Sequence, residues 1–208
     1  MIKAILFDMG GVLVNLDMQR CKDTFKRRCG YDRIDEVLDP CHQRGPFMRM
    51  EHGEISEGEF IAECLADSRP GTTPKDVRDS FWTIIGDLEP YKADLLNELA
   101  KDYPLYMLSN NNPIVMRRIG RLFRKAGIPL DTTFRKLFIS CRMRMLKPTP
   151  EIFAAAVKGT GVKACECLFI DDSPTNVAAA ESAGMHAALY VQGTDLRKTV
   201  YDKLSTIA

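Results

Sequence analysis

The sequence predicts an α/β protein with a doubly wound parallel sheet and an inserted helical domain. Short apolar runs recur along the chain, and stretches with helical periodicity separate most of them. This alternation is typical of parallel sheets that helices cover on both faces. Residues 15–90 differ, because they have helical periodicity and many charges but no strand-like run. We therefore expect this segment to be a helical insertion.

The first expected strand comprises residues 3–7. Its sequence is nearly continuously apolar, as in strands that are buried on both faces. It ends at Asp8, and Gly10 and Gly11 mark the turn that follows. Similar runs predict four further strands, at residues 105–108, 137–140, 167–170 and 187–191.

Local signals predict several helix starts. In the insertion, Ser56 and Glu59 fit a capping box. Pro74 and Pro90 are expected to begin two further helices. Beyond the insertion, Thr149-Pro150 and Ser173-Pro174 each place a capping side chain before a proline suited to the first helical position. The predicted division is a core of residues 1–14 and 91–208 and a helical domain of residues 15–90.

The composition is that of a globular protein with no overall attraction for polyanions. Among 208 residues, 45% are hydrophobic and the net charge is +1, so we expect no binding to nucleic acid or to a membrane surface. No apolar run approaches the length of a membrane span. The seven cysteines form no CxxC pair and are odd in number, which argues against a secreted disulfide framework. A cytoplasmic protein is the simplest expectation.

Polar side chains follow four of the expected strands directly or after a short loop. The carboxyl ends of strands in an open parallel sheet line one crevice, so we expect these side chains to converge. Carboxylates, an ammonium group and hydrogen-bond donors together suit cation-assisted phosphoryl chemistry. The residues are Asp8, Ser109, Asn110, Lys147, Asp171 and Asp172.

Four short motifs containing these residues resemble, in order and spacing, those of the haloacid dehalogenase-like hydrolases. They are Phe7-Asp8-Met9-Gly10-Gly11-Val12, Leu108-Ser109-Asn110, Lys147-Pro148 and Ile170-Asp171-Asp172-Ser173. The match covers nearly the whole chain. The helical segment between the first two motifs is similar to the small cap of this superfamily, the C1 type. The resemblance implies a Rossmann-like core and a phosphatase acting on a small phosphorylated metabolite.

The resemblance also implies a role for each motif. Asp8 would attack phosphorus and form an aspartyl phosphate, which water then hydrolyses. Ser109 and Asn110 would donate hydrogen bonds to the phosphate. Lys147 would balance the charge of Asp8 and of the transferring group.

A hard divalent cation is expected where carboxylates and phosphate crowd together, and Mg²⁺ prefers oxygen ligands. The expected protein ligands are Asp8, Asp172, Asp171 and the main-chain carbonyl of Gly10.

Gly10 departs from the usual first motif. Family phosphatases usually carry a second aspartate at this position, which protonates the leaving oxygen and later activates water. A positioned acid and base contributes about 10²- to 10⁴-fold, so slow turnover is expected unless another group substitutes. Asp17 and His42 are candidate substitutes.

Two other functions compete with the phosphatase. A hydrolytic dehalogenase would use Asp8 to attack carbon and would need no metal, whereas Asp171 and Asp172 suit a cation. A regulatory protein that binds phosphate or metal without turnover would be consistent with Gly10. The basic stretch at residues 117–125 is expected to be a solvated face or a partner contact, because the net charge is close to zero. The oligomeric state cannot be predicted from the sequence.

Overall fold

The computed structural model describes residues 1–38 and 44–207. A parallel five-stranded sheet lies at its centre, in the order β3-β2-β1-β4-β5. The strands are β1 (Ala4–Phe7), β2 (Leu105–Ser109), β3 (Lys136–Ile139), β4 (Cys167–Asp171) and β5 (His186–Leu189). All five lie at or within one or two residues of the predicted positions. The α/β fold with a Rossmann-like sheet is confirmed.

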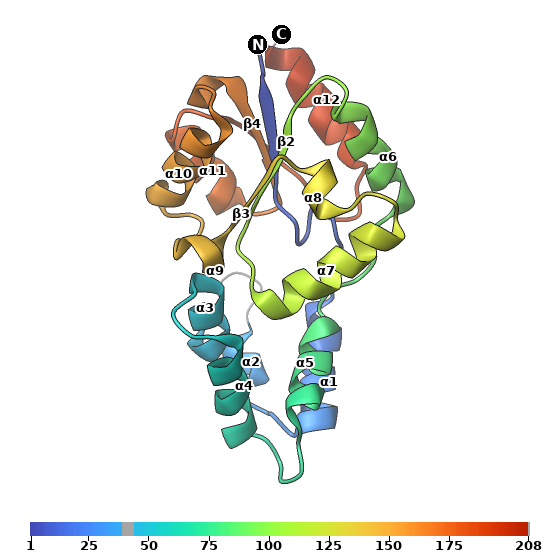
Figure 1. The fold of residues 1–208 in the computed structure, drawn as a ribbon, viewed down its shortest axis with the longest axis vertical. Coiled ribbons are helices and arrows are strands. Elements are labelled where there is room, and N and C mark those ends of the chain that lie inside the picture. Colours follow the sequence, from blue (N-terminus) through green and yellow to red (C-terminus); the bar gives the residue numbers. More distant parts are fainter. Residues whose placement is uncertain (39–43, 208) are drawn as a thin grey trace.

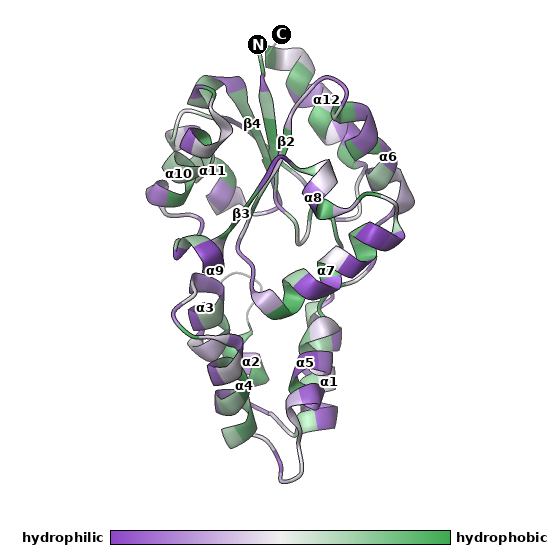
Figure 2. Cartoon of the chain, in the orientation of Figure 1, coloured by the Kyte–Doolittle hydropathy of each residue, from purple (hydrophilic) through white to green (hydrophobic). Residues whose placement is uncertain are grey.

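Helices cover both faces of the sheet (Figure 1). Alternate strand residues point to opposite faces, and Leu6 and Phe7 belong to different hydrophobic clusters. In Figure 2 the strands consist mainly of hydrophobic residues, whereas the helices on either side carry both hydrophobic and hydrophilic residues. The face that carries Leu6 packs against α10 and α11, and the face that carries Phe7 packs against α6, α7 and α12. Their bounds are α6 (Pro90–Leu99), α7 (Pro113–Lys125), α10 (Pro150–Thr160), α11 (Pro174–Ser182) and α12 (Leu196–Ile207).

The described residues also form three short helices and one 3-10 turn. They are α8 (Leu130–Thr133), α9 (Ser140–Met143) and the turn Ala164–Glu166, together with α2 (Ile34–Val37) in the insertion. α9 begins where β3 ends, so Ser140, expected at the end of a strand, is the first residue of a helix instead.

The segment between β1 and α6 forms a group of helices at the end of the molecule opposite the two termini (Figure 1). Besides α2, it contains α1 (Met18–Cys29), α3 (Gly45–His52), α4 (Glu57–Ala66) and α5 (Pro74–Trp82). Four buried phenylalanines, Phe25, Phe47, Phe60 and Phe81, pack edge to face or tilted against one another at its centre. We call this helical group the cap.

Two neighbouring segments of the chain connect the cap to the sheet. Leu16 and Ile85 form an isolated antiparallel bridge. Beside it, the Gly86 N–H donates to the carbonyl of Asn15 at 2.8 Å. The two connections thus lie side by side near the predicted positions, while domain boundaries at residues 14 and 90 remain a prediction.

Most of the predicted helix starts are confirmed. Ser56 and Glu59 form a reciprocal capping box. Pro74 and Pro90 begin α5 and α6. Ser173 accepts from the Asn176 N–H at the start of α11. The capping role predicted for Thr149 is wrong: α10 begins at the expected proline, but the Thr149 side chain makes no capping hydrogen bond.

Within the described part of the chain, no helix is both long enough and apolar enough to cross a membrane.

Candidate active site

The parallel register brings Asp8 and Asp171 to the same end of the sheet. Phe7 of β1 pairs with Ile170 of β4, and the Asp8 N–H donates to the Ile170 carbonyl at 2.9 Å. Asp8 therefore leaves β1 beside Asp171, the last residue of β4. Strand order reverses between β1 and β4, and the crevice at the carboxyl ends of such strands is where ligands bind in open α/β sheets.

Three carboxylates meet in this crevice. One oxygen from each of Asp8, Asp171 and Asp172 lies within 4.8 Å of the others. Gly11 makes room for the third carboxylate: a Cβ at Gly11 would lie 2.0 Å from Oδ2 of Asp172. The residue also has φ of +81°, which favours glycine. The second glycine of the first motif is therefore required by both backbone and space.

Lys147 supplies the positive charge that faces this cluster. Its Nζ lies 2.5 Å from Oδ2 of Asp171 and 3.0 Å from Oδ1 of Asp8. Burial alone would lower the pKa of Lys147, but Asp171 and Asp8 outweigh it and raise this pKa above its usual value. The residue is thus a buried ammonium group at any pH near neutrality.

Asn110 fixes the position of Lys147 through the main chain. Its Oδ1 accepts from the Lys147 N–H at 2.8 Å, and its Nδ2 donates to the Lys147 carbonyl at 2.9 Å. Ser109, the last residue of β2, is buried next to Asp8, and its hydrogen bonding lowers the pKa of Asp8. The second motif therefore orients the lysine, in addition to its predicted contact with phosphate.

Asp171 is held more tightly than the other two acids. Its Oδ1 accepts from the Ser173 N–H at 2.8 Å and from Nδ2 of Asn176 at 2.9 Å. Its Oδ2 is engaged by Lys147. Both oxygens are already hydrogen-bonded, whereas Asp172 is exposed to the crevice. Of the two acids, Asp172 therefore has the carboxylate that is freer to bind a cation.

The carboxylate cluster carries a negative charge that a bound cation would offset. Burial, opposed by Lys147 and reinforced by Asp171, raises the pKa of Asp8. Burial, with Asp8 and Asp171 as further causes, raises the pKa of Asp172 to about 7. Three carboxylates and the Lys147 ammonium group sum to a formal charge of −2. A divalent cation would neutralise it.

The donor set also fits Mg²⁺. All side-chain donors are carboxylate oxygens, the type this ion prefers. Asp8 Oδ1 is buried and, despite the nearby Lys147, has no hydrogen bond of good geometry among the described residues. Within the same set, no hydrogen bond is donated to the Gly10 carbonyl. Both oxygens therefore keep the lone pairs that a cation needs.

The two residues expected as substitutes for the missing aspartate are Asp17 and His42. Asp17 lies at the start of α1, where its Oδ1 accepts from the Arg20 N–H at 2.9 Å. It caps that helix and is exposed, so its carboxylate already has a structural role. His42 lies outside the described residues.

Sequence reasoning did not single out Glu51, which comes from the cap. Burial raises its pKa to about 8, and Asp8 and Lys147 are among the groups that act on it. Its main-chain carbonyl accepts from Ser140 Oγ at 2.6 Å, so this end of α3 is bound to the core. Gly53, which follows the helix, is typical of a helix end but does not reveal where the helix docks.

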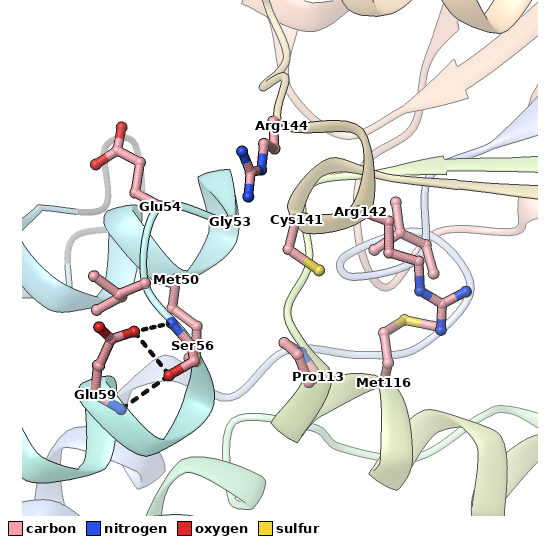
Figure 3. A pocket seen from close by; sticks show the side chains of 12 residues that line it. Met50, Gly53, Glu54, Ser56, Glu59, Pro113, Met116, Cys141, Arg142 and Arg144 are labelled. Atoms are coloured by element: carbon pink, nitrogen blue, oxygen red, sulfur yellow. Dashed lines mark hydrogen bonds between the residues drawn. The ribbon is translucent and has the colours of Figure 1, made fainter.

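A cavity of about 450 Å³ lies beside this contact, between the cap and the core. Figure 3 shows α3 and the start of α4 on one side, and α7 and α9 on the other. None of the predicted site residues lines it, so we assign the chemistry to the aspartate cluster and not to this cavity. Its lining is Met50, Gly53, Glu54, Ile55, Ser56, Glu59, Pro113, Met116, Ile139, Cys141, Arg142 and Arg144.

Comparisons with known proteins support the family that the motifs of this site resemble. Residues 2–184 match the family described as haloacid dehalogenase-like hydrolase. The chain belongs to this family. D-ribitol-5-phosphate phosphatase of Bacteroides thetaiotaomicron is 32% identical over 199 residues, which span 95% of this chain and 96% of that enzyme. Flavin mononucleotide hydrolase 1 of Arabidopsis thaliana is 40% identical over 164 residues, 78% of this chain and 63% of the relative.

A solved structure of the family has a fold similar to that of this chain. A haloacid dehalogenase family enzyme of Bacteroides thetaiotaomicron, in complex with magnesium and inorganic phosphate, has a TM-score of 0.87 and 33% identity. The alignment covers 93% of this chain and 96% of that one. With relatives named as phosphatases and hydrolases, the chain is an enzyme of the phosphatase type. The magnesium complex of the neighbour supports the expected cofactor.

Proposed function

We propose that this enzyme hydrolyses a small phosphorylated metabolite through a covalent phosphoryl intermediate on Asp8, with Mg²⁺ as cofactor. The observation that carries the proposal is the environment of Asp8. Its carboxylate lies at the ends of the central strands, 3.0 Å from a buried ammonium group and close to two further carboxylates. That environment is suited to a dianionic phosphate bound together with a divalent cation.

The position of each residue suggests its role in the reaction. Asp8 is the nucleophile, and its Oδ1 has no competing hydrogen bond of good geometry in the described part of the chain. Lys147 stabilises negative charge on Asp8 and on the transferring phosphoryl group. Ser109 and Asn110 lie at the end of β2 to donate hydrogen bonds to the phosphate.

Asp8, Asp172 and the Gly10 carbonyl would hold the metal ion, with Asp171 close by. When bound, Mg²⁺ supplies positive charge that neutralises the phosphate and the carboxylates. The hydrogen bonds that Asp171 receives from Ser173 and Asn176 support a second role, in which it orients Lys147.

The two competing functions find less support. A dehalogenase needs no cation, yet Asp171 and Asp172 create a negative cluster beside Asp8. A regulatory protein without turnover would be favoured if no group replaced the missing aspartate at Gly10. Glu51, described above, is a carboxyl group whose pKa is shifted by Asp8 and Lys147 as well as by burial.

For the substrate, we propose the phosphate ester of a sugar or of its reduced alcohol. The support is the similarity over nearly the full length to an enzyme named for D-ribitol 5-phosphate. The similarity to a flavin mononucleotide hydrolase covers less of either protein. A flavin phosphate is therefore the second substrate to test.

The test is a screen of phosphate release with Mg²⁺ and with a chelator, for wild type and Asp8→Asn. Alditol phosphates, sugar phosphates and flavin mononucleotide form the three arms. We expect metal-dependent release that is largest with an alditol or sugar phosphate and is absent in Asp8→Asn. Equal activity in the variant would rule out Asp8 as the nucleophile, and preference for the flavin would correct the substrate class.

A further inference from the structure

The proposed reaction lacks a proton donor where one is usually found. The oxygen that leaves phosphorus must gain a proton unless it is a stable anion, and the attacking water must later lose one. Gly10 has no side chain, and Asp17 is used to cap α1. Among the described residues, we therefore sought the donor on another element near the crevice.

Helix α3 of the cap packs against α9, which follows β3 at the carboxyl end of the sheet. Gly53 follows the helix with φ of +78°, and a Cβ there would lie 2.3 Å from the Cys141 carbonyl oxygen. The absence of a side chain at Gly53 allows the end of α3 to approach α9 this closely. Glu51 is two residues earlier, in the last turn of the helix.

Ser140 fixes this end of α3 to the loop after β2. Its Oγ donates to the Glu51 carbonyl at 2.6 Å and accepts from the Asn111 N–H at 2.9 Å. Asn111 follows the Ser109-Asn110 pair directly. The main chain at Glu51 is thus linked through one buried hydroxyl group to the loop that borders the phosphate site.

The Glu51 carboxyl lies within electrostatic reach of the nucleophile. Met50 and Gly53 line the cavity of about 450 Å³, whereas Glu51 does not. The groups that act on its carboxyl are Asn112, Asp8 and Lys147. Asn112 Oδ1 caps α7 by accepting from the Val115 N–H at 3.1 Å. Its Nδ2 is buried and makes no hydrogen bond of good geometry among the described residues.

We propose that Glu51 replaces the missing aspartate, donating a proton to the leaving oxygen and later accepting one from water. This inference rests on the proposed function. It makes the cap a contributor to the chemistry and not only a cover. Asn112, fixed by its capping bond, would be a positioning residue that orients the Glu51 carboxyl.

Atoms and charges balance in both steps. In the first, an Asp8 oxygen bonds to phosphorus while the bond to the leaving oxygen breaks. The leaving oxygen keeps the electron pair and takes the proton of Glu51, which becomes a carboxylate. In the second, a water oxygen attacks phosphorus, its proton returns to Glu51, and the bond to Asp8 breaks. The products are an alcohol and phosphate, and both carboxyl groups are restored.

The ionisation state of Glu51 agrees with this role. Burial, reinforced by the negative charge of Asp8, raises the pKa of Glu51 to about 8, against the opposing effects of Asn112 and Lys147. Cys141 is a further titratable group that interacts with Glu51. This direction favours the protonated carboxyl, which is the form that donates a proton.

The test compares two esters in wild type, Glu51→Gln and Glu54→Gln. An alkyl phosphate has a poor leaving group, whereas p-nitrophenyl phosphate releases a stable anion. The quantity to compare is kcat/KM, which reports on the step that expels the leaving group. We expect Glu51→Gln to lower it by about 10²- to 10⁴-fold for the alkyl ester and by much less for the aryl ester. Glu54→Gln, a change of an exposed glutamate in the same turn, should alter neither.

A second variant separates catalysis from folding. Adding Gly10→Asp to Glu51→Gln should restore much of kcat/KM for the alkyl ester, since it returns a carboxyl to the usual place. In Glu51→Gln alone, the aryl ester should give a burst of phenol because the second step is slow. Equal losses with both esters and no rescue would overturn the role of Glu51, as would no loss with either. If the wild type shows no Mg²⁺-dependent hydrolysis or Asp8→Asn retains it, the proposed function itself fails.

Discussion

Gly11 and Asp172 occupy complementary space: the missing side chain of one is where the carboxylate of the other lies. A Cβ on Gly11 would lie 2.0 Å from Asp172 Oδ2 and 2.5 Å from its Cγ. The two residues are 161 positions apart in the chain, yet Gly11 cannot gain a side chain while Asp172 keeps its place. The first motif therefore provides both the proposed nucleophile and the space for a proposed metal ligand that directly follows β4.

Gly11→Ala should displace Asp172 and weaken metal binding. The new methyl group cannot coexist with the carboxylate in its present place, so we expect Mg²⁺ affinity to fall at least tenfold. Strain at φ of +81° should also lower the free energy of unfolding by about 1–3 kcal/mol. Calorimetric titration with Mg²⁺ and urea unfolding measure the two effects.

Gly127→Ala is the matched control. Gly127 has φ of +78°, but nothing lies within 4 Å of the position its Cβ would take. It should show similar strain with unchanged metal affinity. Equal loss of affinity in both variants would mean that the space next to Asp172 is not what matters.

Lys147→Met should destabilise the metal-free protein strongly. The substitution leaves two buried carboxylates without their shared cation, and breaking such a pair costs about 3–5 kcal/mol. Added Mg²⁺ should recover part of this loss. In the control Lys198→Met, removal of an exposed pair with Asp202 should leave urea unfolding nearly unchanged, because solvent screens the pair. Similar results for the two lysines in urea unfolding would contradict the buried charge balance.

Gly10→Asp should raise turnover of substrates with poor leaving groups most clearly in the Glu51→Gln background, because Glu51 already serves as proton donor in the proposed wild-type mechanism. A Cβ at Gly10 would lie 3.1–3.2 Å from the methyl groups of Leu16, a flexible side chain that needs to move only slightly. The fold should therefore accept the change. Steady-state kinetics with an alkyl phosphate and with p-nitrophenyl phosphate would show the gain in the first alone. No gain with intact metal binding would mean that proton transfer does not limit this enzyme.

Metal-free stability should depend on pH through Asp172. The pKa of this group rises from 3.8 to about 7 on folding, so the folded state holds its proton more strongly than the unfolded state. Its contribution to stability is then complete below about pH 4 and is lost as the pH rises through about 7. Relative to Asp172→Asn, the wild type in chelator should lose Tm between pH 5 and 8. A difference that is flat or rises with pH would show that the three acids are not crowded. Mg²⁺ affinity should increase over the same range, since the ion needs the carboxylate form.

The sheet and the chemical residues were predictable because local patterns determine them. Strands buried on both faces require continuous apolar runs, and Asp8 and Asp172 directly follow two such strands. Parallel pairing then brings the strand ends together. The failures were local as well. Thr149 precedes a proline but makes no capping bond, and Ser140 leaves the strand to begin a helix.

Contacts between the cap and the core were not predictable in this way. Glu51 has no distinctive local pattern, and its position depends on how α3 docks on α9. The same is true of Asn110, whose pairing with the main chain of Lys147 requires a loop 37 residues away. Such contacts arise from tertiary packing, which short-range periodicity does not encode.

The central claim is that Asp8 carries the phosphoryl group during turnover. Its most direct test is acid quenching of the enzyme during hydrolysis of its best substrate, followed by mass spectrometry of the peptides. We predict one added phosphoryl group on the peptide containing Asp8, which is absent in Asp8→Asn and more abundant in Glu51→Gln. Unimpaired turnover by Asp8→Asn, or a phosphoryl group on another residue, would contradict the account.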